Sequence, residues 1–336
     1  MKTEEKQIYT IDDIARELGV SKTTVSRAIS GKGRIGRETR ERVLDFIVEH
    51  DYRPNSVAKG LAQKKTYNLA LFLPKDYAVT EFPFFKECTQ GICEITAQYD
   101  YDVILSMIEA DDTSQLQRIV ANRKVDGIIL SRAIEHSGVQ EYLKRCGVPF
   151  VVIGPTEDPE VTYVDNKNLE ASQELSEIML QKGVKRLALL GGQHVYNVTG
   201  SRYQGYIRAH ERLKCPLDVG LVYMDCDNQT KVSAAVDRIL EQGADGILCM
   251  DDAICNMCIS SLRERKIQIP TQIRVASLYD SRNLEYNNPP ITSVRFDTVR
   301  LGKAAAGKLL HMLGEKVEED TAPMSYQVVL RESTQC

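Results

Sequence analysis

Three short runs of apolar residues at helical spacing, all within residues 10–50, constrain this chain more than any other feature. Thr10 stands three residues before Asp13, which is the pattern of a capping box at the start of a helix. Ser21 can cap a second helix, and a third is expected over residues 37–50. Because helices this short cannot bury an apolar face alone, the pattern predicts three helices around one small core.

The second predicted helix has a polar face made of Lys22, Thr23, Ser26 and Arg27. Lysine and arginine can donate to guanine O6 and N7, and a tight turn at Gly19 before this helix makes a helix-turn-helix that fits the DNA major groove. The alternative is a solvated amphipathic helix pair. The side chains expected in the core are Ile11, Ile14, Ala15, Leu18, Val25, Ala28, Ile29, Val43, Leu44 and Ile47.

The chain that follows the third helix favours the DNA-binding interpretation. Pro54 breaks the helix, and residues 56–64 have the pattern of one more short helix. Gly60 lies inside this segment and costs about 1 kcal/mol relative to alanine, so the helix is expected to be marginal by itself.

Together these segments resemble the DNA-binding headpiece of the LacI/GalR (lactose-repressor) family. The resemblance is carried almost continuously by four motifs: T-x-x-D-I-A from Thr10, G-V-S-x-x-T-V-S-R from Gly19, T-R-x-x-V from Thr39 and Y-x-P-N-x-x-A-x-x-L from Tyr52. It implies a headpiece over residues 1–54 and a hinge helix with linker over residues 55–66.

The resemblance also implies which residues meet DNA. Lys22, Thr23 and Arg27 would read the major groove, and the hinge helix would lie on the minor groove. Leu61 would be pushed between central base pairs and kink the duplex; its alternative role is a linker residue packed on the next domain. The full set implied to bind DNA is Thr10, Ser21, Lys22, Thr23, Ser26, Arg27, Asn55, Ala58 and Leu61.

From residue 67 onward, short apolar runs alternate with helical stretches, which predicts parallel sheets with helices on both faces. An internal echo suggests two similar lobes in tandem: Leu69-Ala70-Leu71 recurs from Leu187, and Asp126-Gly127-Ile128 recurs from Asp245, at offsets of 118 and 119. The expected strands are 68–73, 102–107, 127–130, 150–153, 186–190, 221–224, 246–250, 274–278 and 291–296.

Open parallel sheets bind ligands beyond the carboxyl ends of their strands, so a cleft between two such lobes is expected to hold a small effector. Polar and aromatic residues follow the expected strands, among them Ser131 and Arg132. An acid after a strand is often only the cap of the next helix, and an arginine can be an interlobe ion-pair partner; both alternatives stay open. The predicted effector-binding residues are Tyr77, Phe84, Phe85, Arg202, Asp251, Asp252 and Asp280.

This second part resembles the periplasmic-binding-protein-like effector domain of the same family, through motifs such as Phe82-Pro83-Phe84-Phe85 and the run from Ser201 to Tyr206. The resemblance implies that Arg202 and Asp280 grip the effector. This sequence departs from the family pattern at two places. It has Asp251-Asp252 where members commonly have Asn-Asp, and Leu278 where they commonly have glycine. The implied lobes are about 67–165 with 294–325, and about 166–293 with 326–336.

Charge and composition separate the two parts. Residues 1–65 carry a net charge of +4 and the remainder −8, so the small basic part is the one suited to a polyanion. Nine cysteines without framework spacing, and an N-terminus without an apolar segment, indicate a reduced, cytoplasmic protein that does not enter a membrane. The Cys255-x-x-Cys258 pair stands alone in sequence, so small apolar residues on a helix are favoured over zinc or redox chemistry.

No nucleophile motif, metal cluster or phosphate loop has supporting spacing, so no catalytic residue, cofactor or metal is expected. A solute-binding protein would need an export signal and no headpiece. The sequence therefore predicts a cytoplasmic transcriptional regulator, a repressor, that binds a pseudo-palindromic operator in double-stranded DNA as a homodimer. Its effector is expected to be a sugar or sugar derivative, with a nucleobase or a protein corepressor as alternatives.

Overall fold

The computed structural model describes residues 9–335 apart from 32, 53–59, 61–62, 76–82, 110–111, 134–137, 157 and 319–321. The chain divides into two compact units, Met1–Thr66 and Tyr67–Cys336. Among the described residues, no helix combines the length and the apolar character needed to cross a membrane.

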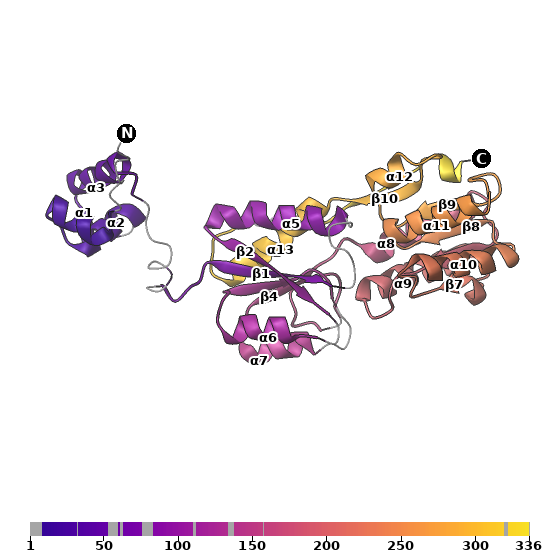
Figure 1. Ribbon diagram of the computed structural model, residues 1–336, viewed down its shortest axis with the longest axis horizontal. Helices are drawn as coiled ribbons and strands as arrows, with labels where there is room; N and C mark the ends of the chain where they lie inside the picture. Colours follow the sequence, from indigo (N-terminus) through magenta and orange to yellow (C-terminus); the bar gives the residue numbers. More distant parts are fainter. Residues whose placement is uncertain are drawn as a thin grey trace, which may run out of the picture. The chain divides into compact units, whose positions relative to one another are not determined.

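The first unit contains α1 (Ile11–Leu18), α2 (Lys22–Ser30) and α3 (Arg37–Glu49) around one core (Figure 1). The predicted capping box is present, because the Thr10 hydroxyl accepts from the Asp13 amide at 3.3 Å and the Thr10 amide donates to the Asp13 carboxylate at 2.9 Å. The fully buried side chains are Ile14, Val25, Ala28 and Val43.

One predicted core residue of this unit was wrong. Leu44 is 37% exposed, and Phe46 packs against the core in its place. On a helix the residues three and four after Val43 share its face, whereas its immediate neighbour is turned away by about 100°. The core face of α3 therefore runs through Val43, Phe46 and Ile47.

The second unit contains two sheets. The first has the order β2-β1-β3-β4-β5 with every neighbouring pair parallel. Its strands are β1 (Asn68–Pro74), β2 (Asp102–Ile108), β3 (Gly127–Leu130), β4 (Phe150–Ile153) and β5 (Tyr163–Val164). Its helices are α5 (Pro83–Thr96), η1 (Ala97–Tyr99), α6 (Ser114–Ala121), α7 (Val139–Cys146) and α13 (Thr298–Met312).

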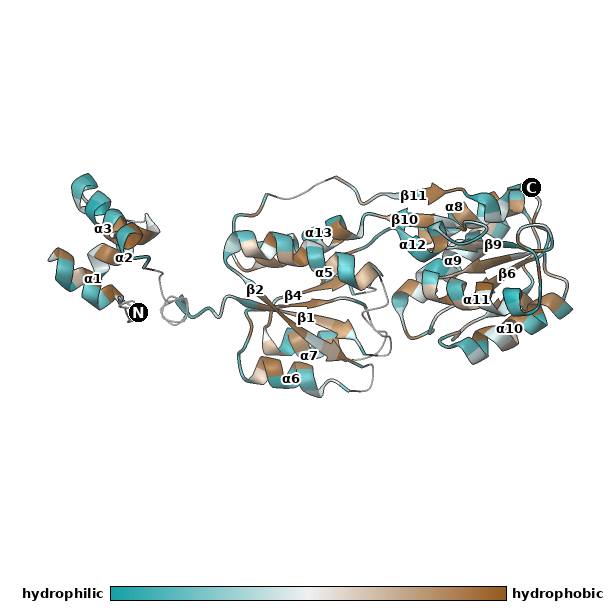
Figure 2. Ribbon diagram, turned by 45° about the horizontal axis from the view of Figure 1, so that its top comes forward, coloured by the Kyte–Doolittle hydropathy of each residue, from teal (hydrophilic) through white to brown (hydrophobic). Residues whose placement is uncertain are grey.

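Alternate residues of β1 serve the two faces of this sheet. Leu69 and Leu71 share a core with α5 and α13, whereas Ala70 and Phe72 share a core with α6 and α7. The two helix pairs accordingly lie on opposite faces of the sheet (Figure 1). In the hydropathy colouring the central strands β1 and β4 of this sheet are mostly brown (Figure 2), as expected for a sheet covered on both sides.

The second sheet has the order β11-β10-β9-β8-β6-β7, and only the β10–β11 pair is antiparallel. Its strands are β6 (Leu187–Leu190), β7 (Val222–Tyr223), β8 (Gly246–Cys249), β9 (Arg274–Ser277), β10 (Thr292–Phe296) and β11 (Tyr326–Val329). Its helices are α8 (Asn168–Gln181), α9 (Asn197–Leu213), η2 (Val219–Leu221), α10 (Gln229–Glu241), α11 (Asp252–Glu264), α12 (Arg282–Glu285) and η3 (Glu332–Thr334).

The echo in the sequence corresponds to a repeated topology. Strands β7, β6, β8, β9 and β10 follow the same order as β2, β1, β3, β4 and β5. The repeated aspartate has one role in both lobes: Asp126 accepts from the amide of Tyr67 at 2.9 Å, and Asp245 accepts from the amide of Arg186 at 2.8 Å. These carboxylates tie the start of one central strand to the start of its neighbour.

Every predicted strand has a counterpart, and β5 and β11 were not predicted. Two residues of β5 are too few for a periodic signal, and β11 is a four-residue edge strand with only partly buried side chains. Strand β10 is hydrogen-bonded into the second sheet over its whole length. The next element along the chain, α13, packs on the first sheet. The lobe boundaries inferred from the sequence, including the one near 294, stay predictions.

Candidate functional sites: an exposed recognition face and an interlobe cleft

The polar face predicted on α2 is solvent-exposed. All four of its residues are exposed: Lys22, Thr23, Ser26 and Arg27. Val25 and Ala28, on the opposite side of the helix, are fully buried. This alternation follows from the helical period, because burying one side of α2 in the core necessarily presents the other. The Lys22 ammonium forms an ion pair with the exposed carboxylate of Asp12 on α1.

Two of the hydroxyls predicted to meet DNA also begin helices. Thr10 caps α1, and the Ser21 hydroxyl accepts from the Thr24 amide at 3.1 Å to cap α2. Both residues remain exposed. Asn55, Ala58 and Leu61 lie outside the described residues, so their DNA-binding roles stay predictions, as do those of the residues on α1 and α2.

Within the second unit, a cleft of about 620 Å³, including its open mouth, lies between residues of the two lobes. Five of the predicted effector residues line it: Phe84, Phe85, Arg202, Asp251 and Asp252. Tyr77 lies outside the described residues. The other lining residues are Ser131, Arg132, Ile153, Gly154, Asp165, Asn166, Asn168, Val198, Tyr279 and Leu301.

Arg202 on α9 is fixed in the cleft by hydrogen bonds. Its Nε donates to Asn168 Oδ1 at 3.2 Å and its Nη1 donates to the carbonyl oxygen of Met250 at 2.5 Å. No carboxylate of the described residues lies within ion-pair distance of its guanidinium. Burial lowers the pKa of Arg202, and the charge of Asp251 opposes this effect.

Asp251 and Asp252 differ in what they contact. Asp251 is the N-cap of α11, since its Oδ1 accepts from the Ile254 amide at 2.8 Å. Asp252 is 5% exposed, and the buried Ser281 hydroxyl acts on its carboxyl and lowers its pKa. Burial and the neighbouring Asp251 carboxylate raise the pKa of Asp252 to about 7. The helix-cap interpretation thus describes Asp251, while both residues line the cleft.

Arg132 lies against aromatic rings. Its guanidinium carbon is 5.3 Å from the ring centre of Phe85 and 4.2 Å from that of Tyr196. Tyr196 precedes α9 of the second lobe, so this cation–π contact joins the two lobes across the cleft. Asn197 adds a second interlobe contact by donating to the carbonyl oxygen of Pro155 at 3.0 Å.

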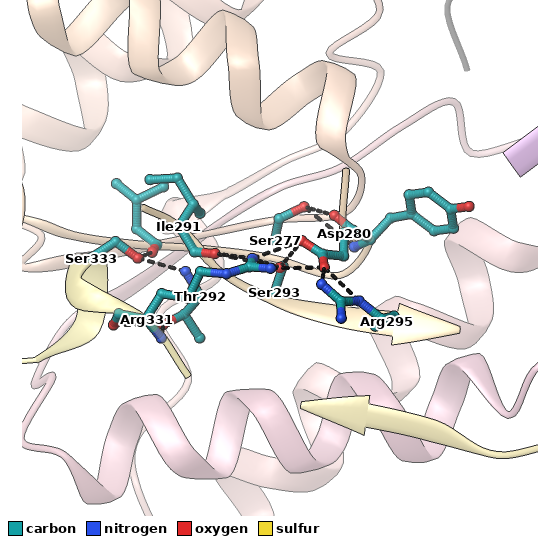
Figure 3. A network of polar contacts seen from close by, with 10 residues as sticks. Ser277, Asp280, Ile291, Thr292, Ser293, Arg295, Arg331 and Ser333 are labelled. Atoms are coloured by element: carbon teal, nitrogen blue, oxygen red, sulfur yellow. Dashed lines mark hydrogen bonds and ion pairs between the residues drawn. The ribbon is translucent and has the colours of Figure 1, made fainter. Parts of the chain in front are cut away.

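That Asp280 grips the effector with Arg202 stays a prediction, and Asp280 is not among the residues that line the cleft. Its carboxylate is bound by Arg331 at 2.7 and 2.9 Å and by Arg295 at 2.7 and 3.0 Å, and it accepts from the Ser293 hydroxyl at 2.5 Å (Figure 3). Sequence reasoning missed this network because Arg331 is distant along the chain and reaches Asp280 only through the pairing of β11 with β10.

The cysteine pair of α11 lies in the core. Cys255 and Cys258 are fully buried, and so is Cys249 at the end of β8. Burial is the main cause that raises the pKa values of Cys249 and Cys255. Among the described residues, no group of three or more His, Cys, Asp or Glu side chains is arranged to hold a metal ion. These cysteines pack as small apolar residues.

An exposed recognition helix in one unit and a two-lobed α/β fold with an interlobe cleft in the other define a DNA-binding regulator with a ligand-binding domain. Residues 10–55 match the model of bacterial regulatory proteins of the lacI family, and residues 177–334 match the periplasmic binding protein-like domain. The chain belongs to the lacI family of DNA-binding transcriptional regulators.

Relatives align over almost the whole chain. The HTH-type transcriptional regulator RegA of Clostridium saccharobutylicum is 28% identical over 335 residues, covering 97% of this chain and 99% of that protein. Catabolite control protein A of Staphylococcus aureus is 27% identical over 330 residues, with coverages of 97% and 99%. These relatives are transcriptional regulators and not enzymes.

Two solved structures have similar folds. The transcriptional regulator CelR–cellobiose complex superimposes with a TM-score of 0.73 at 26% identity and covers 97% of this chain and 99% of that one. The lac repressor dimer bound to operator and the anti-inducer ONPF gives a TM-score of 0.80 at 20% identity, with coverages of 98% and 100%, and therefore shows the fold alone.

Proposed function

We propose that this protein is a cytoplasmic transcriptional repressor that binds a pseudo-palindromic operator as a homodimer and responds to a sugar or sugar derivative in the interlobe cleft. The observation that carries the DNA-binding role is the exposed face of α2, on which Lys22 and Arg27 stand opposite the buried Val25 and Ala28. Cellobiose in the complex of the relative CelR supports the effector class.

The mechanism we infer is allosteric. An effector that prefers one degree of lobe closure would change the spacing of the two hinge segments, residues 55–66, in a dimer and so order or melt their helices. Coupling of this kind is typically worth about 1–3 kcal/mol, and its sign decides whether the effector induces or represses. The hinge residues lie largely outside the described part of the chain, so this mechanism rests on the resemblance.

Selection of bound sequences from a random duplex pool, at about 0.15 M salt to suppress non-specific binding, tests this function directly. We expect a palindromic motif of roughly 14 to 20 base pairs with a flexible pyrimidine–purine centre. A pool that shows no enrichment, both alone and with candidate sugars present, would rule out the operator-binding role.

Lys22→Ala is expected to relax operator specificity at one base position by about 1–3 kcal/mol, because an exposed lysine at the start of a recognition helix can donate to a base edge. Affinities for single-base operator variants measure the effect. Lys182→Ala removes an equal charge from an exposed position in the other unit and should change nothing. A loss that is uniform across sequences would mean that Lys22 contacts phosphate.

Leu105→Asp is expected to weaken dimerisation at least tenfold, because it places a charge in an apolar patch that a second copy would cover. Leu105 is 56% exposed and Met107 43% exposed, and both lie on β2, an edge strand of the first sheet. Sedimentation equilibrium measures the dimer constant. Val219→Asp changes a 70% exposed apolar residue beside the other sheet and is the control. Unchanged dimerisation of Leu105→Asp would contradict this interface.

A further inference from the structure

The recognition helix α2 begins with a cation where a helix favours an anion. Lys22 is its first residue, directly after the Ser21 cap, and the first turn contains no acidic residue. The free amide groups at a helix N-terminus carry partial positive charge, so a lysine at this position is disfavoured by its own helix. The stability of α2 therefore does not explain why a lysine stands there.

The compensating charge comes from the other helix of the motif. Asp12 of α1 forms an ion pair with the Lys22 ammonium, and the two side chains are 45% and 66% exposed. Asp12 is not needed to cap α1, because Thr10 and Asp13 form the capping box. An exposed ion pair contributes little to stability, and a carboxylate close to DNA repels phosphate. Both arguments favour a role for Asp12 in the complex with DNA.

The ion pair presents a donor and an acceptor side by side. A lysine ammonium can donate to N7 and O6 of guanine, and an aspartate carboxylate can accept from the N4 amino group of cytosine. The major-groove edge of a G·C pair has two adjacent acceptors followed by this donor, whereas an A·T pair has an acceptor, a donor and an acceptor. The paired charges of Asp12 and Lys22 therefore match the edge of a G·C pair.

We propose, building on the operator-binding role assigned above, that Asp12 reads DNA together with Lys22 and that this ion pair recognises one G·C base pair in each half-site. Lys22 donates to the two acceptors of guanine, and Asp12 accepts from N4 of cytosine. Reading by both charges also fixes which strand carries the guanine, because reversing the base pair exchanges the positions of the acceptors and the donor. Asp12 is thus a specificity-determining residue contributed by the helix before the recognition helix.

The second cation of the exposed face, Arg27, is held by a loop. A Cβ at Gly33 would lie 3.2 Å from Cδ of Arg27, so the arginine side chain passes across this glycine. Gly33 has a φ of +92°, a conformation that other residues rarely adopt. A change at Asp12 is therefore expected to act at the base pair that Lys22 contacts and to leave the contacts of Arg27 unaltered.

The test measures the affinity of the full-length protein for the selected operator and for all its single-base-pair variants. Asp12→Ala is expected to reduce the preference for G·C over C·G and A·T about fivefold or more at one position of each half-site, and to keep the preferences elsewhere. Glu17→Ala removes an equal charge from an exposed position near the other end of α1 and should change no preference. Thermal unfolding of each variant checks that the headpiece keeps its fold.

A double-mutant cycle distinguishes one shared contact from two independent ones. Asp12→Ala, Lys22→Ala and the double variant are compared on the selected operator and on its variant with A·T at the affected position. We expect the double variant to lose little more discrimination than either single variant, because each single change already disrupts the joint reading. Losses that add in full would overturn the proposal, because the two residues would then act separately.

Two results with Asp12→Ala alone would also overturn the inference. A rise in affinity that is equal for every sequence would mean that the carboxylate only repels phosphate. Unchanged affinities would assign Asp12 to the dipole of α1. Either result, with an operator recovered by the selection described above, would leave the DNA-binding role intact. A selection without enrichment would reject the proposed function itself.

Discussion

Gly205→Ala is expected to lower the free energy of unfolding by about 3 kcal/mol, because a methyl group at this position has no space. Gly205 lies on α9 where that helix crosses α8. A Cβ there would lie 2.3 Å from the carbonyl oxygen of Leu169 and 2.9 Å from the amide nitrogen of Gln173, both of them backbone atoms that cannot turn aside. The helices would have to separate, and the Arg202 side chain would leave the cleft with α9.

Gly200→Ala provides the control on the same helix. A Cβ at Gly200 meets nothing within 4 Å, so alanine there should stabilise the protein by up to about 1 kcal/mol through its helix propensity. Denaturant unfolding of the two variants measures both effects. Equal stabilities of the two variants would contradict the close approach of α8 and α9.

Arg331→Ala is expected to cost about 3–5 kcal/mol of unfolding free energy, because it leaves a carboxylate buried without its main partner. The side chains of Arg331 and Asp280 are only 10% and 6% exposed, and two hydrogen bonds join them. The pair anchors the C-terminal segment to the end of β9 (Figure 3). Arg295, which is half exposed, also binds Asp280 but cannot replace Arg331 in the interior.

Chemical unfolding of the single and double variants measures this pair. Arg331→Ala combined with Asp280→Asn should lose less than the sum of the two single changes, because the second removes the uncompensated charge. Arg186→Ala breaks an ion pair with Asp218 in which both side chains are 47% exposed, and should cost less than about 1 kcal/mol. A loss from Arg331→Ala no larger than that of Arg186→Ala would show that the buried pair is dispensable.

The hydrogen bonds to Asp280 also make the free energy of unfolding depend on pH. Burial raises the pKa of Asp280, but the hydrogen bonds from Arg331, Ser293 and Arg295 outweigh it, and the net pKa lies below the ordinary value. A carboxyl group with a lowered folded pKa stabilises the protein above its unfolded pKa, and this contribution disappears as the pH falls through the folded pKa. Asp252 has a raised pKa and acts in the opposite direction, at higher pH.

The recognition helix could be predicted from the sequence because its determinants are local. The capping box at Thr10, the turn at Gly19 and the alternation of Val25 and Ala28 with polar neighbours all act within a few residues. Only Leu44 on α3 was misplaced, because the apolar residues 43, 44, 46 and 47 are compatible with more than one core face and only the packing against α1 and α2 selects Val43, Phe46 and Ile47.

The cleft could be predicted in outline but not in detail. The rule that ligands lie beyond the carboxyl ends of parallel strands placed Ser131, Arg132, Asp251 and Asp252 correctly at one opening. It could not show that Asp251 caps a helix while Asp252 is buried beside Ser281 with a raised pKa, because the two residues are identical and adjacent.

The sequence by itself determined the elements of this protein, since helix caps, apolar periodicity and the repeated Asp-Gly at strand starts are set by neighbouring residues. The tertiary structure alone decided which charges meet. Asp280 follows β9, and the antiparallel pairing of β11 with β10 brings Arg331 to it from near the end of the sequence. A guanidinium that donates two hydrogen bonds neutralises a buried carboxylate more effectively than solvent can, so this contact between distant parts of the chain stabilises Asp280 in its buried position.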